Sequence, residues 1–161
     1  MALPICRLKK KKMANYLDLS NKSSVAGQGR LPKFRGEIDS VSTLAADTTL
    51  YDYNSGSVYF LNGASTFDVT LPAVKAGLSF KFIIVDVTAD VDIVQADAAH
   101  DFVGTIIDGA GSSDTAAGSD TKIIFDQSGG SAAGDWVCLH CDGSKWYVSG
   151  GCDAAGGVVF G

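Results

Sequence analysis

Residues 67–85 carry the clearest structural signal in the chain and read Phe67-Asp-Val-Thr-Leu-Pro-Ala-Val-Lys-Ala-Gly-Leu-Ser-Phe-Lys-Phe-Ile-Ile-Val. The first five residues alternate apolar and polar side chains, which is the period of a half-buried β-strand. A proline and a glycine then indicate a break. The stretch ends in an apolar run, which is typical of a central strand covered on both faces. Two strands joined by a short connection are therefore expected.

Similar strand signals continue outward from this stretch at short spacing, separated by turn-forming pairs such as Asn62-Gly and Asp142-Gly. The predicted strands are residues 41–44, 50–53, 58–61, 67–71, 79–87, 91–94, 102–107, 122–125, 135–141 and 145–149. Of 18 acidic residues 17 are Asp, which favours turns over helix interiors. We predict a single-domain, all-β fold, a β-sandwich or barrel that is jelly-roll-like by preference. No internal repeat is visible.

The predicted core consists of residues that face inward from these strands. They are Val58, Phe60, Phe67, Val69, Leu71, Phe80, Phe82, Ile84 and Trp136. Residues 135–141 and 145–149 are expected to pair as a hairpin across an Asp-Gly-Ser turn. Its aromatic residues, Trp136, Trp146 and Tyr147, fit either a sugar-stacking platform or the core, and pairing across the hairpin favours the core.

Charge divides the chain into a basic arm and an acidic body. Residues 1–35 hold nine basic residues and one acidic residue, a net charge of +8, whereas residues 36–161 hold four and seventeen, a net charge of −13. We predict an extended N-terminal arm over residues 1–36 and a β-body over residues 37–161. Met13-Ala-Asn-Tyr resembles a natural start, so residues 1–12 are, as a hypothesis, an upstream extension. The acidic body argues against nucleic acid as a partner.

The cysteines pose the question of a metal site. Cys6, Cys138, Cys141 and Cys152 are expected to be free thiols, because the chain opens without a secretory signal. Cys138-Leu-His-Cys with Cys152 offers zinc-ligand types. On a strand, however, Cys138 and His140 face one way and Cys141 the other, so we expect no bound metal. No stretch reaches the roughly 18 apolar residues needed to span a membrane.

Other catalytic and binding patterns are weak. Asp108, Asp114 and Asp120 are six residues apart, wider than in a calcium loop, so residues 108–120 are expected to form a solvated loop. His100 and His140 lack a motif around a nucleophile. A carboxylate pair for glycoside hydrolysis is defined by distance in space, which the sequence leaves open. We predict a protein that is not an enzyme and has no cofactor.

Two regions carry a resemblance to a known protein family. Residues 44–47, 58–64 and 67–85, together with Gly134-Asp-Trp-Val and Asp142-Gly-Ser-Lys-Trp-Tyr-Val-Ser-Gly, resemble small structural proteins of tailed bacteriophages, especially cyanophages and other marine phages. The resemblance implies a capsid decoration (cement) protein on the virion surface. It also implies a homotrimer seated on the major capsid protein. Related modules of phage fibres leave a receptor- or carbohydrate-binding module as the alternative.

The arm provides the predicted capsid contact, since a cement protein needs an extended segment that orders on docking. The contact residues are Arg30, Leu31, Pro32, Lys33, Phe34 and Arg35. Phe34 is the apolar anchor, and the guanidinium groups suit carboxylates on a partner.

Overall fold

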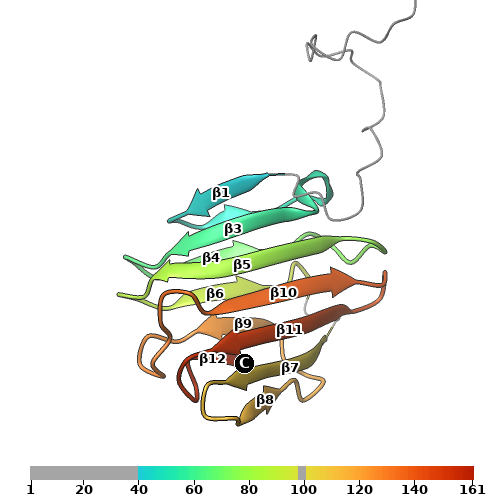
Figure 1. The fold of residues 1–161 in the computed structure, drawn as a ribbon. Coiled ribbons are helices and arrows are strands. Elements are labelled where there is room, and N and C mark those ends of the chain that lie inside the picture. Colours follow the sequence, from blue (N-terminus) through green and yellow to red (C-terminus); the bar gives the residue numbers. More distant parts are fainter. Residues whose placement is uncertain (1–39, 98–100) are drawn as a thin grey trace, which may run out of the picture. The chain divides into compact units, whose positions relative to one another are not determined.

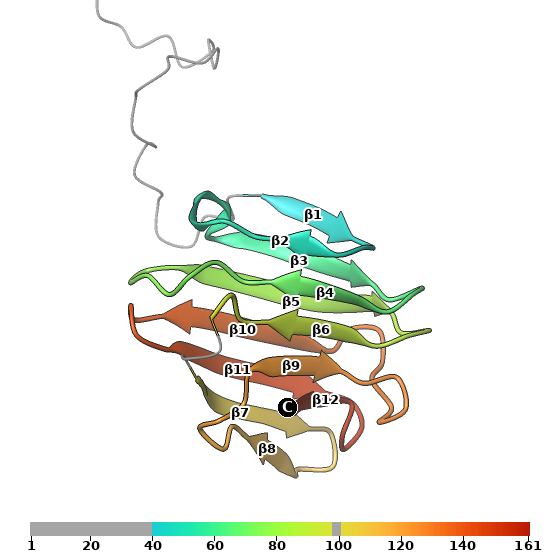
Figure 2. The same ribbon diagram turned by 180° about the vertical axis from the view of Figure 1, so that it is seen from behind.

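The computed structural model describes residues 40–97 and 101–161, which form a sandwich of two β-sheets (Figure 1 and Figure 2). One sheet has the order β1 (Val41–Leu44), β3 (Ser57–Asn62), β5 (Ser79–Asp86), β10 (Trp136–Cys141), β11 (Trp146–Cys152), β7 (Phe102–Asp108), β8 (Ser113–Thr115). The other has the order β12 (Val158–Phe160), β9 (Lys122–Phe125), β6 (Val91–Val94), β4 (Phe67–Thr70), β2 (Thr48–Thr49). The predicted all-β sandwich is confirmed. The predicted arm, residues 1–36, lies outside the described residues.

The first six strands alternate between the two sheets, so the chain winds between them as a coil. β1, β3 and β5 pair in parallel in the seven-stranded sheet, and β2, β4 and β6 pair in parallel in the five-stranded sheet. Parallel neighbours need a crossover, and here each crossover is a strand of the opposite sheet. The later strands add antiparallel pairs, including the predicted hairpin of β10 and β11. Within the sandwich class, these connections differ from those of an antiparallel jelly roll.

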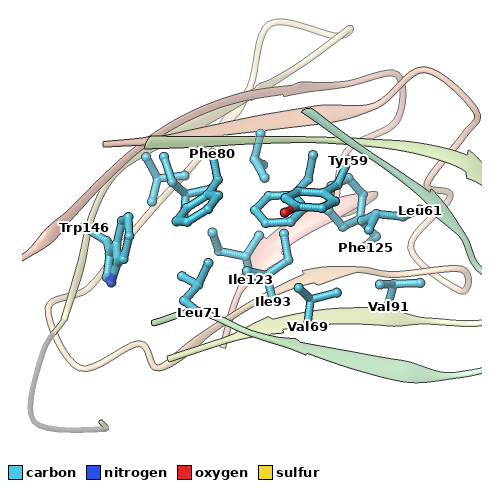
Figure 3. Close-up of a cluster of buried hydrophobic side chains, with 14 of the residues drawn as sticks. Tyr59, Leu61, Val69, Leu71, Phe80, Val91, Ile93, Ile123, Phe125 and Trp146 are labelled. Carbon is cyan, nitrogen blue, oxygen red and sulfur yellow. The ribbon is translucent and has the colours of Figure 1, made fainter. Parts of the chain in front are cut away.

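The core lies between the sheets (Figure 3). Tyr59 and Phe80 from the seven-stranded sheet meet Leu71, Ile93 and other branched side chains from the five-stranded sheet. Of the predicted core residues, Phe67, Val69, Leu71, Phe80, Phe82 and Ile84 are buried.

Three predicted core residues point the other way. Val58 and Phe60 are half-buried on the outer side of β3, whose inner positions are Ser57, Tyr59 and Leu61. Because residues 58–61 are all apolar, alternation did not fix which of them faces inward. On the hairpin, Trp136 is half-buried on the outer side, and Trp146 fills the core.

The structure differs from several of the predicted elements. Residues 50–53 do not form a strand: a 3₁₀ turn, Asp52–Asn54, follows β2, and the Tyr51 N–H donates to the Asn54 side chain. The predicted loop 108–120 contains the short strand β8, and β12 carried no strand signal that we recognised. Among the described residues, no helix is long and apolar enough to cross a membrane.

Candidate functional site: the outer face of the seven-stranded sheet

Several predicted site residues fall outside the described chain. These are the six arm residues, Arg30, Leu31, Pro32, Lys33, Phe34 and Arg35, together with Cys6 and His100. The capsid contact predicted for the arm therefore stays a prediction.

The cysteines and His140 do not converge on one point. Cys138 and His140 lie on the outer side of β10, and Cys141 is buried on the inner side. Cys152 ends β11 opposite Asp108, at the other end of the hairpin from Cys141, which pairs with Trp146. Within residues 40–97 and 101–161, no three His, Cys, Asp or Glu side chains gather closely enough to hold a metal ion.

Neither half-buried thiol is activated as a nucleophile. Burial raises the pKa of Cys138, and the nearby Lys81 ammonium opposes the shift. Burial also raises the pKa of Cys152, and the carboxylates of Asp135 and Asp108 add to the effect. A reactive cysteine needs a lowered pKa, so both thiols behave as small apolar side chains at neutral pH.

The aspartates of residues 108–120 bind backbone groups instead of converging. Asp108 is buried and accepts the N–H groups of Ala110 and Ser112 at 2.9 and 2.8 Å. Asp114 accepts the Phe160 N–H at 2.7 Å and so joins β8 to β12. These carboxylates hold turns and strand edges in place.

The apolar side chains outside the sandwich form a row across the seven-stranded sheet. The strand register aligns Phe60 with Ile83, Ile83 with Trp136, Trp136 with Gly151, and Gly151 with Ile107. Val58 and Val85 lie beside this row on β3 and β5. We call these six side chains the apolar face: Val58, Phe60, Ile83, Val85, Trp136 and Ile107. Figure 1 views the sheet from this side.

Trp136 lies at the centre of the apolar face. A Cβ atom added to Gly151 would lie 3.2 Å from the indole Nε1, so the glycine leaves room for the ring over its neighbouring strand. The Lys81 ammonium is 5.1 Å from the centroid of the ring, a cation–π contact. Beyond the ring, a depression of about 550 Å³ extends over Gly150 and Gly151 to Ile107, and Asp108, Asp135 and Asp153 also line it.

Figure 2 views the five-stranded sheet from its outer side, where the side chains have a different chemistry. Asp68 and Asp92 lie side by side on β4 and β6, and Lys122 on β9 is 2.8 Å from the Asp92 carboxylate. The hydrogen bond to Asp92 raises the pKa of Lys122. The two outer faces are thus an apolar one and a charged one.

The sequence carries a signal for the apolar face on β5. The apolar run at the end of residues 67–85 predicted a strand covered on both faces. In the structure Phe82 and Ile84 are buried, Ile83 is half-buried and Val85 is 44% exposed. The outward positions Ile83 and Val85 therefore leave apolar side chains on the outer side of β5.

No protein-family model, curated protein or solved structure matches this chain. The choice among functions therefore depends on the chemistry of the surface and the resemblance described above.

Proposed function

We propose that the protein is a structural assembly protein, a capsid decoration (cement) protein whose apolar face docks on a shell of major capsid protein. The observation that carries the proposal is the distribution of charge. The described residues include fifteen aspartates, and none occupies an outward position on a strand of the seven-stranded sheet. Keeping carboxylates away from the outward positions of these strands avoids the cost of desolvating them when the apolar face is covered.

The composition of the apolar face supports a protein partner. Interface centres are depleted in charged residues and enriched in aromatic ones, with a polar rim. Here Trp136 is central, and Lys81 covers its ring while remaining able to reach solvent or a partner carboxylate. The polar residues Thr105, Ser149 and Thr115 continue the outer surface toward β8.

Binding to empty shells of the parent particle tests the proposal. Ile107→Ser removes a side chain that is 57% exposed on the apolar face. The affinity of this variant for shells should fall about tenfold, as expected when an interface residue contributes more than 1 kcal/mol. Ile124→Ser is the matched control, because Ile124 lies on β9 beside Asp92, on the charged outer face. An equal loss of shell affinity in both variants, or no loss in either, would rule out docking through the apolar face.

The proposal includes the homotrimer that the resemblance implies. Cyclic assemblies close by repeating one contact, so three copies can sit around one capsid symmetry axis. Sedimentation equilibrium should give the mass of three chains at micromolar protein. A monomer in solution, with single copies on the shell by electron microscopy, would contradict this part.

A further inference from the structure

A groove of about 430 Å³ lies where three parallel strands of the five-stranded sheet end. Its lining comes from the segments that follow β2, β4 and β6, and includes Leu50, Leu71, Val74 and Ala96. The Leu50 N–H donates to the Thr70 carbonyl and the Leu71 N–H to the Val94 carbonyl, both at 2.8 Å. These bonds fix the groove floor to the sheet. It is separate from the apolar face, because none of that face's residues lines it.

A pair of stacked tyrosines borders the groove. Tyr51 lines it, and the ring of Tyr53 stacks on the ring of Tyr51 with centroids 5.3 Å apart and planes 12° apart. Tyr51 and Tyr53 are 52% and 63% exposed, so neither side chain is needed to fill the core. Asn54 holds the turn: its side chain accepts the Tyr51 N–H, and its own N–H donates to the Tyr51 carbonyl, both at 2.9 Å. The aromatic surface is therefore formed in advance.

Opposite charges meet at the rim beside these rings. The Lys75 ammonium donates to the Asp52 carboxylate at 2.7 Å, with both side chains more than half exposed. The hydrogen bond from Lys75 and its positive charge lower the pKa of Asp52, so this carboxylate is ionised at neutral pH. Since the two charges offset each other, the groove rim is nearly neutral on an otherwise acidic body. It offers hydrogen-bond acceptors and donors to a ligand without selecting a strongly charged one.

We propose that this groove binds a neutral saccharide. A sugar ring presents a C–H face that packs on an exposed aromatic ring, and its hydroxyl groups both donate and accept hydrogen bonds. Tyr51 supplies the ring, Asp52 accepts hydroxyl protons and Lys75 donates. The half-buried Pro72 and Val74 give the apolar floor, above the buried Leu71. This inference is independent of capsid docking, which uses the opposite sheet.

Titration of the full chain with cellohexaose, maltohexaose and chitohexaose tests the site, with binding followed by amide NMR shifts. At least one of these neutral oligosaccharides should shift residues around Tyr51 and Lys75. Tyr51→Ala should weaken that binding by at least about tenfold, and Asp52→Asn should weaken it to a smaller extent. Tyr147→Ala is the control, because Tyr147 is a comparably exposed tyrosine on the other sheet.

The outcomes separate saccharide binding from other occupants. Weaker oligosaccharide binding by Tyr51→Ala, with unchanged binding by Tyr147→Ala, supports the proposal. Absence of shifts with all three oligosaccharides, or equal binding by wild type and Tyr51→Ala, overturns it. A peptide with the sequence of residues 30–36 is titrated in parallel. If only the peptide shifts the groove, the occupant is a segment of this chain and the saccharide site is wrong.

Discussion

Phe60 and Leu61 are neighbours on β3 that face opposite sides of the sheet. Leu61 is fully buried, whereas Phe60 is half-buried on the apolar face. The sequence predicted correctly that this segment is a strand, but it placed Phe60 inside. Four consecutive apolar residues satisfy either phase of a two-residue period, and the pairing of β3 with β5, which stacks Tyr59 beside Phe82 with ring centroids 5.6 Å apart, sets the phase.

Paired truncations test this assignment. Leu61→Ala should lower the free energy of unfolding by about 2–5 kcal/mol, because it leaves a cavity between the sheets. Phe60→Ala should cost less, although it removes a larger side chain, because part of that ring already meets solvent. Urea denaturation of both variants provides the comparison. A larger loss for Phe60→Ala would restore the inward position predicted from the sequence.

Asp142 illustrates a residue whose role the turn signal predicted well. Its carboxylate accepts the Ser144 and Lys145 N–H groups at 2.7 and 2.9 Å and the Ser144 hydroxyl at 2.8 Å, which closes the β10–β11 hairpin. These bonds, led by the Ser144 N–H, lower the pKa of Asp142.

A lowered folded-state pKa predicts a specific pH dependence. The ionised carboxylate stabilises the fold above its unfolded pKa of about 3.9, and the contribution is lost as pH falls through the lower folded value. Asp142→Asn should therefore reduce Tm at pH 7, and the difference from wild type should shrink below about pH 4. Thermal melts across this range measure it. A difference that is constant with pH would assign the effect to turn geometry instead of charge.

At the scale of elements, the sequence predicted the longer strands that carry a hydrophobic period and missed the short strands β2, β8 and β12. β8 reads Ser-Asp-Thr and has no apolar residue, so no period marks it. It forms because it pairs with β7 and because Asp114 reaches the Phe160 N–H of β12. Such contacts join residues far apart in the chain, and local patterns do not contain them.

Gly104 provides an element-scale prediction on β7. A Cβ atom there would overlap the carbonyl oxygen of Val148, its partner on β11, so Gly104→Ala must push the two strands apart. Gly118→Ala is the control, since Gly118 also has a positive φ, +82°, but faces open space. The control should cost roughly 1 kcal/mol of unfolding free energy, and Gly104→Ala at least about 2 kcal/mol more. If denaturant melts gave similar losses of unfolding free energy for the two variants, the close approach of β7 and β11 at Gly104 would be contradicted.

For the whole molecule, composition and turn spacing predicted the class of fold. They did not predict how the strands connect and pair. Whether residues 58–61 pair in parallel with residues 79–87 or with another strand depends on which sheet each connection enters. The candidate site was also predictable only in part. The apolar run on β5 was visible in the sequence. The row of outward apolar side chains was not, because it also takes residues from β3, β10 and β7, which strand pairing brings into register.

The apolar face and the charged residues of the arm predict different responses of shell binding to salt. Raising ionic strength from about 0.15 M to about 1 M shortens the Debye length from about 8 Å to about 3 Å, which screens exposed ion pairs and leaves apolar burial intact. The loss of affinity in Ile107→Ser should therefore be the same at both concentrations.

The arm residues extend the same test. Lys33→Ala should weaken shell binding at the lower salt concentration only, by about 0.2–1 kcal/mol. Phe34→Ala should weaken it at both, by about 2 kcal/mol if the ring is a buried hot spot. Shell pull-downs with the full-length variants measure all three effects. If the effect of Ile107→Ser disappears at high salt while Phe34→Ala keeps its effect, the arm alone provides the apolar contact, and the apolar face serves another partner.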